Sequence, residues 1–140
     1  MVDLARRIAA EKEKVERALD NLKDVMDRGE KTVVELAAIA TFIHNIYSGI
    51  ENILKQVLKA RGRDIPQSKT WHKDLLNDSV SIGIVSKKLS DELYEYLTFR
   101  HFFVHAYGFL LEEEHLKDLA NNISTIWLEF LSAVENSLEI

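Results

Sequence analysis

The side chains best suited to chemistry lie together near position 100 of this 140-residue chain. The run reads Phe99-Arg100-His101-Phe102-Phe103-Val104-His105-Ala106-Tyr107-Gly108 and holds two of the five histidines. Histidine titrates near neutral pH, so it can both take and return a proton. Arginine is permanently charged and presents a planar fork that matches phosphate oxygens. The pairing of these two residue types therefore indicates chemistry on a phosphodiester.

A base and a phosphate-holding cation are the minimum set for cleaving RNA by attack of its own 2′-hydroxyl on the adjacent phosphorus. The substrate brings the nucleophile, so neither a metal ion nor a protein nucleophile is needed. General-base catalysis typically contributes about 10²–10⁴-fold, and a preorganised donor at the developing oxyanion contributes about 10²–10³-fold. His101 and His105 have the i, i+4 spacing of a metal-binding pair, but the chain has no cysteine and no evident third ligand. We therefore expect no metal and no cofactor.

Motifs of most other enzyme classes are absent from the sequence. It has no Walker loop, no Gly-x-Gly-x-x-Gly, no Gly-x-Ser-x-Gly and no His-Glu-x-x-His. We expect His44, His72 and His115 to be structural, because a lone histidine on a helix is more often a surface or core residue. The apolar members of the run are expected to pack rather than to stack on bases: Phe99, Phe102, Phe103, Val104 and Phe109.

The spacing within the run limits how its polar groups can meet. On an ideal helix, Arg100 and His105 lie about 140° apart and do not share a face. His101 and His105 do share a face, and so do Arg100 and Tyr107. Either the helix distorts near its end, or two copies of the run meet across a two-fold axis and line one cleft. We favour the second arrangement, because an isologous dimer would also cover excess apolar surface elsewhere on the chain.

Apolar residues recur with the 3.6-residue period of amphipathic helices along the whole chain. The single proline and five glycines also suit long helices. The pattern predicts helices over about residues 3–28, 32–61, from 70 onward, 90–107 and 112–138, with a loop at 62–69 and an ambiguous stretch at 77–83. The expected fold is one all-α domain over residues 1–140, an up-down bundle of four long helices plus one short helix.

Residues with capping character mark the expected ends of these helices: Asp3, Gly29, Thr32-x-x-Glu35, Gly62 and Ser90. We expect Asp3 and Ser90 to be N-caps and Gly29 to be a left-handed C-cap, while the Thr32 pattern predicts a capping box. The helix after Thr32 has a wider apolar face than a surface helix needs. We interpret that width as burial against both neighbouring helices and a second subunit.

Charge is distributed unevenly along the chain. The formal net charge of −5 argues against a general polyanion binder. The middle third is basic, whereas residues 106–140 are strongly acidic, and solvated helix faces are the simplest interpretation of both. No apolar run approaches the roughly 18–20 residues that cross a bilayer, and the N-terminus has no signal-peptide core. We therefore expect a cytoplasmic protein without a membrane partner.

The run from Arg100 to Tyr107 resembles the signature of a known family. Arg100-His101-x3-His105-Ala106-Tyr107 is similar to the Arg-polar-x3-His motif of HEPN domains, in the Arg-x4-His-x-Tyr form of the HepT ribonuclease toxins. The resemblance extends over nearly the whole chain. It implies an all-α homodimer that acts as a metal-independent ribonuclease, with the two motifs facing each other across the dimer interface.

The resemblance also implies a role for each motif residue. Arg100 would hold the phosphate, His105 would be the acid and base, and His101 would occupy the polar position that supports RNA binding. The partner would be a minimal nucleotidyltransferase antitoxin of the MntA type, which transfers AMP to the tyrosine that corresponds to Tyr107. The substrate would be RNA, with tRNA as the expected class.

Other interpretations of the same residues remain open at this point. The chain could be a non-catalytic dimeric HEPN subunit that docks a nucleotidyltransferase, or a helical scaffold that contains Arg-x4-His by chance. Arg100 could pair with a carboxylate on a neighbouring helix, and Tyr107 could be a packing or capping residue.

Overall fold

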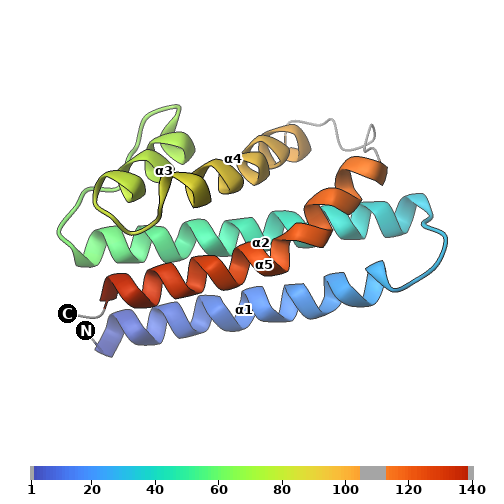
Figure 1. Cartoon of the computed structure of the whole chain (residues 1–140), viewed down its shortest axis with the longest axis horizontal. Helices are drawn as coiled ribbons and strands as arrows, with labels where there is room; N and C mark the ends of the chain where they lie inside the picture. The colour runs from blue at the N-terminus through green and yellow to red at the C-terminus, as the bar shows by residue number, and fades with distance from the viewer. Residues whose placement is uncertain (1, 105–112, 139–140) are drawn as a thin grey trace.

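The computed structural model describes residues 2–104 and 113–138, and every regular element in these ranges is helical. The helices are α1 (Val2–Met26), α2 (Val33–Ala60), α3 (Trp71–Ser81), α4 (Lys87–Phe102) and α5 (Glu113–Leu138). Four of them are long and α3 is short, so the predicted all-α bundle is confirmed. Figure 1 shows α3 and α4 on the opposite side of α2 from α1.

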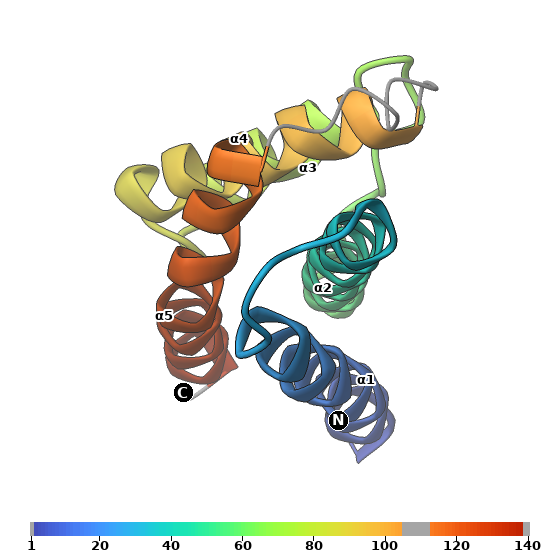
Figure 2. The same cartoon turned by 90° about the vertical axis from the view of Figure 1, so that its right-hand side faces the viewer.

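α2 is the central helix of the bundle, as the end view in Figure 2 shows. It contacts each of the other four helices. Most of its apolar face is removed from water, since Ile43, Ile46 and Ile53 have no exposed surface, whereas Val33 and Val34 at its start are exposed. Burial of this face against neighbouring helices is confirmed, because helices of the same chain cover most of it. Dimerisation stays a prediction.

By length and composition alone, α2 is also long and apolar enough to cross a membrane. The expectation that no segment of the chain reaches this threshold is wrong for α2. The apolar composition of α2 is explained by the four helices packed against it, because a central helix buries residues on most of its sides.

The ends of α2 follow the sequence signals. Thr32 Oγ1 accepts a hydrogen bond from the Glu35 backbone N–H at 3.3 Å, and the Glu35 carboxylate accepts one from the Thr32 backbone N–H at 2.9 Å. This is the predicted capping box, and the hydrogen bonds that the Glu35 carboxylate accepts from the Thr32 backbone N–H and hydroxyl lower the pKa of Glu35. At the other end, Gly62 has a φ of 73°, a left-handed conformation that favours glycine.

The expected caps of α1 are wrong. Asp3 lies within the first turn of the helix, and Gly29 is not among the glycines with positive φ. Instead, the Lys31 ammonium donates hydrogen bonds to backbone carbonyls at and beyond the helix end, those of Met26, Arg28 and Gly29. A lysine near a helix C-terminus can satisfy carbonyls that have no partner within the helix.

The predicted start of α4 is also wrong. Its N-cap is Ser86, whose Oγ accepts a hydrogen bond from the Leu89 backbone N–H at 3.0 Å, and Ser90 is buried inside the helix. The acids after Ser90 are favourable in a first turn, and they shifted the predicted start by one turn. The ambiguous stretch at 77–83 resolves into the end of α3 and a left-handed Gly83.

Gly49 on α2 allows α1 and α2 to approach closely. A Cβ atom at this position would overlap Val15 Cγ2 on α1, whereas Gly29 faces open space. We expect Gly49→Ala to lower the free energy of unfolding by about 1–3 kcal/mol, the usual cost of overpacking, in urea unfolding followed by circular dichroism. Gly29→Ala is the matched control and should stay within about 0.5 kcal/mol of wild type. Equal stability of the two variants would contradict the close approach.

Candidate active site

Arg100 lies in the last turn of α4 and is partly exposed. Its Nε atom is buried and has no hydrogen-bond partner. Within residues 2–104 and 113–138, no carboxylate forms an ion pair with its guanidinium. The alternative in which Arg100 pairs with an acid on a neighbouring helix therefore finds no partner in these residues.

The neighbours of Arg100 divide between core and surface. Phe99 is buried, and Phe103 is half-buried against it with ring centroids 5.9 Å apart. Phe102 and Val104 are 37% and 47% exposed, so they are less buried than the expectation of packing implied, although Phe102 makes contacts of its own. His101 is exposed and makes contacts of its own. Phe109 lies outside the described residues.

The helix changes its winding directly after α4. Phe103 and Val104 continue in π-helical conformation. In a π-helix the hydrogen bonds run from i to i+5, so residues five apart take the close positions that i and i+4 have in an α-helix. Phe103 itself keeps α-helical dihedrals, and its backbone N–H still donates to the carbonyls of Phe99 and Arg100, so the distortion that would bring Arg100 and His105 together stays a prediction. His105 and Tyr107 lie outside the described residues, so their positions relative to Arg100 stay predictions.

A polar stripe on the central helix faces Arg100 and α3. It consists of His44, Tyr47 and Glu51, which are spaced three and four residues apart on α2 and so share one face. The His44 ring packs against the Phe103 ring with centroids 5.4 Å apart. Tyr47 and Glu51 are only 1% and 3% exposed. We expected His44 to be structural and did not predict this stripe. The spacing of three and four residues between polar side chains, within an otherwise apolar helix face, is visible in the sequence and could have indicated it.

The stripe and Arg100 form one electrostatic cluster. Burial lowers the pKa of His44 below its ordinary value, and the charge of Arg100 lowers it further, against opposing effects of Asn45 and Glu51. Burial raises the pKa of Tyr47 far above its ordinary value, and the nearby Glu51 carboxylate raises it further. The imidazole of His44 is therefore neutral near pH 7, and the Tyr47 hydroxyl keeps its proton.

Comparison with known proteins decides the family. A family model described as "HepT-like protein" matches residues 38–139, a range that includes the polar stripe, Arg100, His105 and Tyr107. This protein belongs to the HepT-like family. Searches of curated proteins and of solved structures gave no match. The predicted HEPN-type relationship is thus confirmed, and the fold is the all-α bundle that it implied.

In this HepT-like chain, the buried Glu51 is anchored from α3. Its Oε2 atom lies 2.6 Å from His72 Nδ1, at hydrogen-bond distance. One turn further along α2, the Lys55 ammonium sits 4.0 Å from the centre of the Trp71 ring. Both contacts hold the start of α3 against α2, on the same side of α2 as the polar stripe. His72 is therefore a structural histidine, as expected.

Replacing His72 should show how much its hydrogen bond to Glu51 contributes to the stability of the fold. We expect His72→Ala to lower the free energy of unfolding by about 2–3 kcal/mol, because it leaves the Glu51 carboxylate buried without its hydrogen-bond partner. Thermal and urea unfolding measure the loss. The double variant Glu51→Gln/His72→Ala should lose less than His72→Ala alone, since it removes the buried charge as well. A double variant that is less stable than His72→Ala would show that packing, not charge, dominates.

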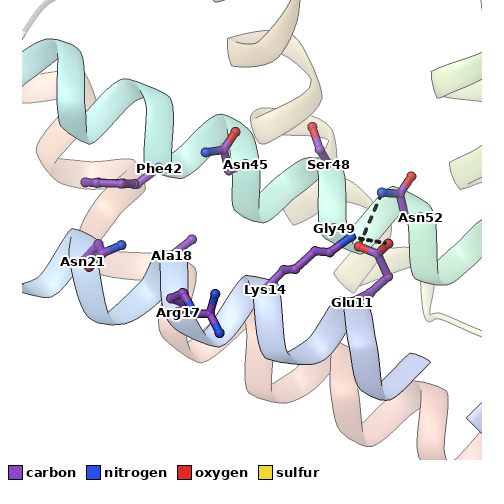
Figure 3. Close-up of a pocket in the computed structure, with 10 residues that line it drawn as sticks. All are labelled: Glu11, Lys14, Arg17, Ala18, Asn21, Phe42, Asn45, Ser48, Gly49 and Asn52. Atoms are coloured by element: carbon purple, nitrogen blue, oxygen red, sulfur yellow. Dashed lines mark hydrogen bonds and ion pairs between the residues drawn. The ribbon is translucent and has the colours of Figure 1, made fainter. Parts of the chain in front are cut away.

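A polar groove on the far side of α2 does not belong to this site. It encloses about 400 Å³ between α1 and α2 and has no motif residue in its lining. Figure 3 shows Glu11 between Lys14 and Asn52, at 3.6 Å and 3.4 Å. Arg17 likewise pairs with Glu13 at 2.9 Å. The cations in this groove are therefore compensated by acids on their own helix, unlike Arg100.

The described parts of the chain contain no group of three or more His, Cys, Asp or Glu residues that could hold a metal ion.

Proposed function

We propose that this HepT-like protein is a metal-independent ribonuclease that acts as the toxin of a toxin–antitoxin pair in the cytoplasm. The observation that supports it best is the guanidinium of Arg100 at the end of α4, which forms no ion pair with any described carboxylate and lies within the family match. A cation without a counter-charge can take a phosphate as its partner. Family membership supports a HEPN-type, toxin-like protein.

In the proposed reaction, His105 removes the proton from a ribose 2′-hydroxyl, and the 2′-oxygen attacks the adjacent phosphorus. The bond from phosphorus to the 5′-oxygen breaks, and that oxygen receives a proton as it leaves. The products are a 2′,3′-cyclic phosphate and a 5′-hydroxyl. Arg100 binds the phosphate and stabilises the charge that develops on its oxygens. His101, exposed on the same turn, contacts the RNA.

Two partners complete the proposal. A second copy of the chain would cover Phe102 and Val104, which are exposed beside the motif at the end of α4. A minimal nucleotidyltransferase of the MntA type would transfer AMP to Tyr107. The added phosphate would neutralise Arg100, and the nucleoside would block access of RNA. With tRNA as the substrate class, the modified toxin would leave tRNA intact.

The deciding experiment incubates the purified chain with total tRNA and maps the products. Cleavage should persist in EDTA, and the products should carry 2′,3′-cyclic phosphate and 5′-hydroxyl ends. Products with 3′-hydroxyl ends would contradict attack by the 2′-oxygen. Absence of cleavage, together with normal growth when the chain is expressed alone, would favour the docking-subunit interpretation.

Tyr107→Phe should separate catalysis from regulation. Phenylalanine keeps the ring and removes the oxygen that accepts AMP, so we expect an active nuclease that the nucleotidyltransferase partner cannot silence. Intact-mass analysis should detect added AMP on the wild type after incubation with partner and ATP, but not on the variant. Modification of Tyr107→Phe to the wild-type level would place the AMP on another residue and overturn the assignment.

A further inference from the structure

Two buried nitrogen atoms without hydrogen-bond partners lie on facing elements at the candidate site. One is Arg100 Nε on α4, and the other is His44 Nε2 on α2. Buried polar atoms in folded proteins are nearly always paired, so an unpaired one calls for a ligand or another explanation. Both residues are only partly buried as a whole, so each side chain also reaches the surface.

The contacts around His44 place these two atoms in the same region. Phe103 directly follows α4, three residues after Arg100, and its ring packs against the His44 ring at 5.4 Å between centroids. The C-terminal end of α4, where Arg100 occupies the last turn, therefore lies beside His44. The charge of Arg100 also reaches the imidazole strongly enough to help lower the pKa of His44.

The other polar groups near His44 leave this nitrogen without a partner. On its own helix, His44 is influenced by the neighbouring Asn45 amide and by the Glu51 carboxylate. Glu51 is held by His72 from α3, at 2.6 Å. From α4, Arg100 is the charged residue that acts on His44. None of these groups accepts a hydrogen bond from, or donates one to, His44 Nε2.

We propose that His44 is a phosphate-binding residue of the active site, which holds the phosphate of the RNA substrate together with Arg100. The inference rests on the proposed function and extends it to a residue outside the Arg-x4-His run. Arg100 Nε–H is a donor, and His44 Nε2 is a donor when the proton of the neutral ring sits on it. An anionic oxygen would supply the acceptor that both atoms lack, and α2 would thereby contribute directly to the site.

Kinetics of two His44 variants test the proposal. We expect His44→Ala to lower kcat/KM for RNA about 10–100-fold, because it removes a hydrogen bond to the charged phosphate. His44→Gln keeps an N–H donor on a side chain of similar reach, so it should retain at least threefold more activity than His44→Ala. Thr41→Ala is the matched control, since Thr41 is an exposed residue on the same helix as His44, and it should behave as wild type. Circular dichroism and melting temperatures establish that each variant is folded.

Activity of His44→Ala within twofold of wild type would overturn the proposal. Equal losses of kcat/KM in the two His44 variants would overturn the proposal as well. The activity would then depend on the volume of the side chain and not on its hydrogen-bond donor. A purely structural role predicts loss of stability in proportion to loss of activity, whereas the proposed role predicts loss of activity in a folded protein.

A binding measurement keeps this proposal separate from the nuclease itself. In NMR spectra of the ¹⁵N-histidine-labelled wild type, the His44 signals should shift saturably on titration with a 2′-deoxy dinucleotide, which has a phosphodiester but no nucleophile. The shift should be lost in Arg100→Ala. If the wild type cleaves RNA while the His44 signals do not respond, the His44 proposal fails and the nuclease stands. If the signals respond in a protein that cleaves no RNA, the nuclease proposal fails and the phosphate site stands.

Discussion

Replacing His105 with alanine is expected to lower the rate of RNA cleavage by about 10²–10⁴-fold, the usual contribution of a positioned general base. The attacking 2′-hydroxyl is a poor nucleophile until its proton is removed, and alanine cannot remove it. The residual rate should reflect phosphate binding by Arg100 alone. Single-turnover cleavage of a labelled tRNA, at enzyme concentrations above saturation, measures the chemical step directly.

The matched control for His105→Ala is Thr41→Ala, which truncates an exposed side chain on α2. It should cleave RNA at the wild-type rate. Expression in cells provides a second measurement, because growth arrest by the wild type should be relieved by His105→Ala. If wild type and His105→Ala are indistinguishable in every RNA assay, the Arg-x4-His run is incidental and the scaffold interpretation holds.

Arg100→Lys is expected to lower kcat/KM by about 10²–10³-fold although the charge is kept. Lysine presents a point charge rather than a planar fork, so it cannot make two parallel bonds to a phosphate. It also has no counterpart to the buried Nε–H. The protein should stay folded, because Arg100 forms no ion pair with the described carboxylates. Steady-state kinetics with thermal unfolding separates the two effects.

Arg17→Lys is the matched control for this substitution. Arg17 is an exposed arginine on α1 that pairs with Glu13 at 2.9 Å, and a lysine can replace it in such a surface pair at little cost. Its activity should equal that of wild type. Activity of Arg100→Lys within threefold of wild type would mean that charge alone suffices, and it would remove the argument for bidentate phosphate binding.

Much of the fold could be predicted from local signals. The capping box at Thr32 and Glu35 and the end of α2 before Gly62 both appear in the structure as predicted, because each depends on residues within one turn of it. The start of α4 at Ser86 rather than at Ser90 was not predictable in the same way. Both serines are suitable caps, and the packing of α4 on α2 and α3 decides which one lies at the helix end.

The relation between Arg100 and the end of α4 is a second case in which local rules do not suffice. An ideal helix separates residues five apart by about 140°, and this value made a second subunit the favoured explanation. The structure has π-helical conformation at Phe103 and Val104, but His105 lies outside the described residues, so the helix distortion and the second subunit both stay predictions. The free-energy cost of a π-helical turn is offset by packing and hydrogen bonds that the surrounding side chains form. These tertiary contacts cannot be predicted from the sequence pattern of one helix.

By itself, the sequence determined that the chain is helical, how many helices it has, and which run resembles a HEPN motif. Periodicity, caps and motif spacing are properties of neighbouring residues, so they can be read along the chain. Only the tertiary structure decided that α2 is enclosed by four helices and that His44, Tyr47 and Glu51 face the end of α4 and α3. The physical reason is that a helix surface offers several faces to its neighbours, and which face meets which partner depends on the packing of all five helices together.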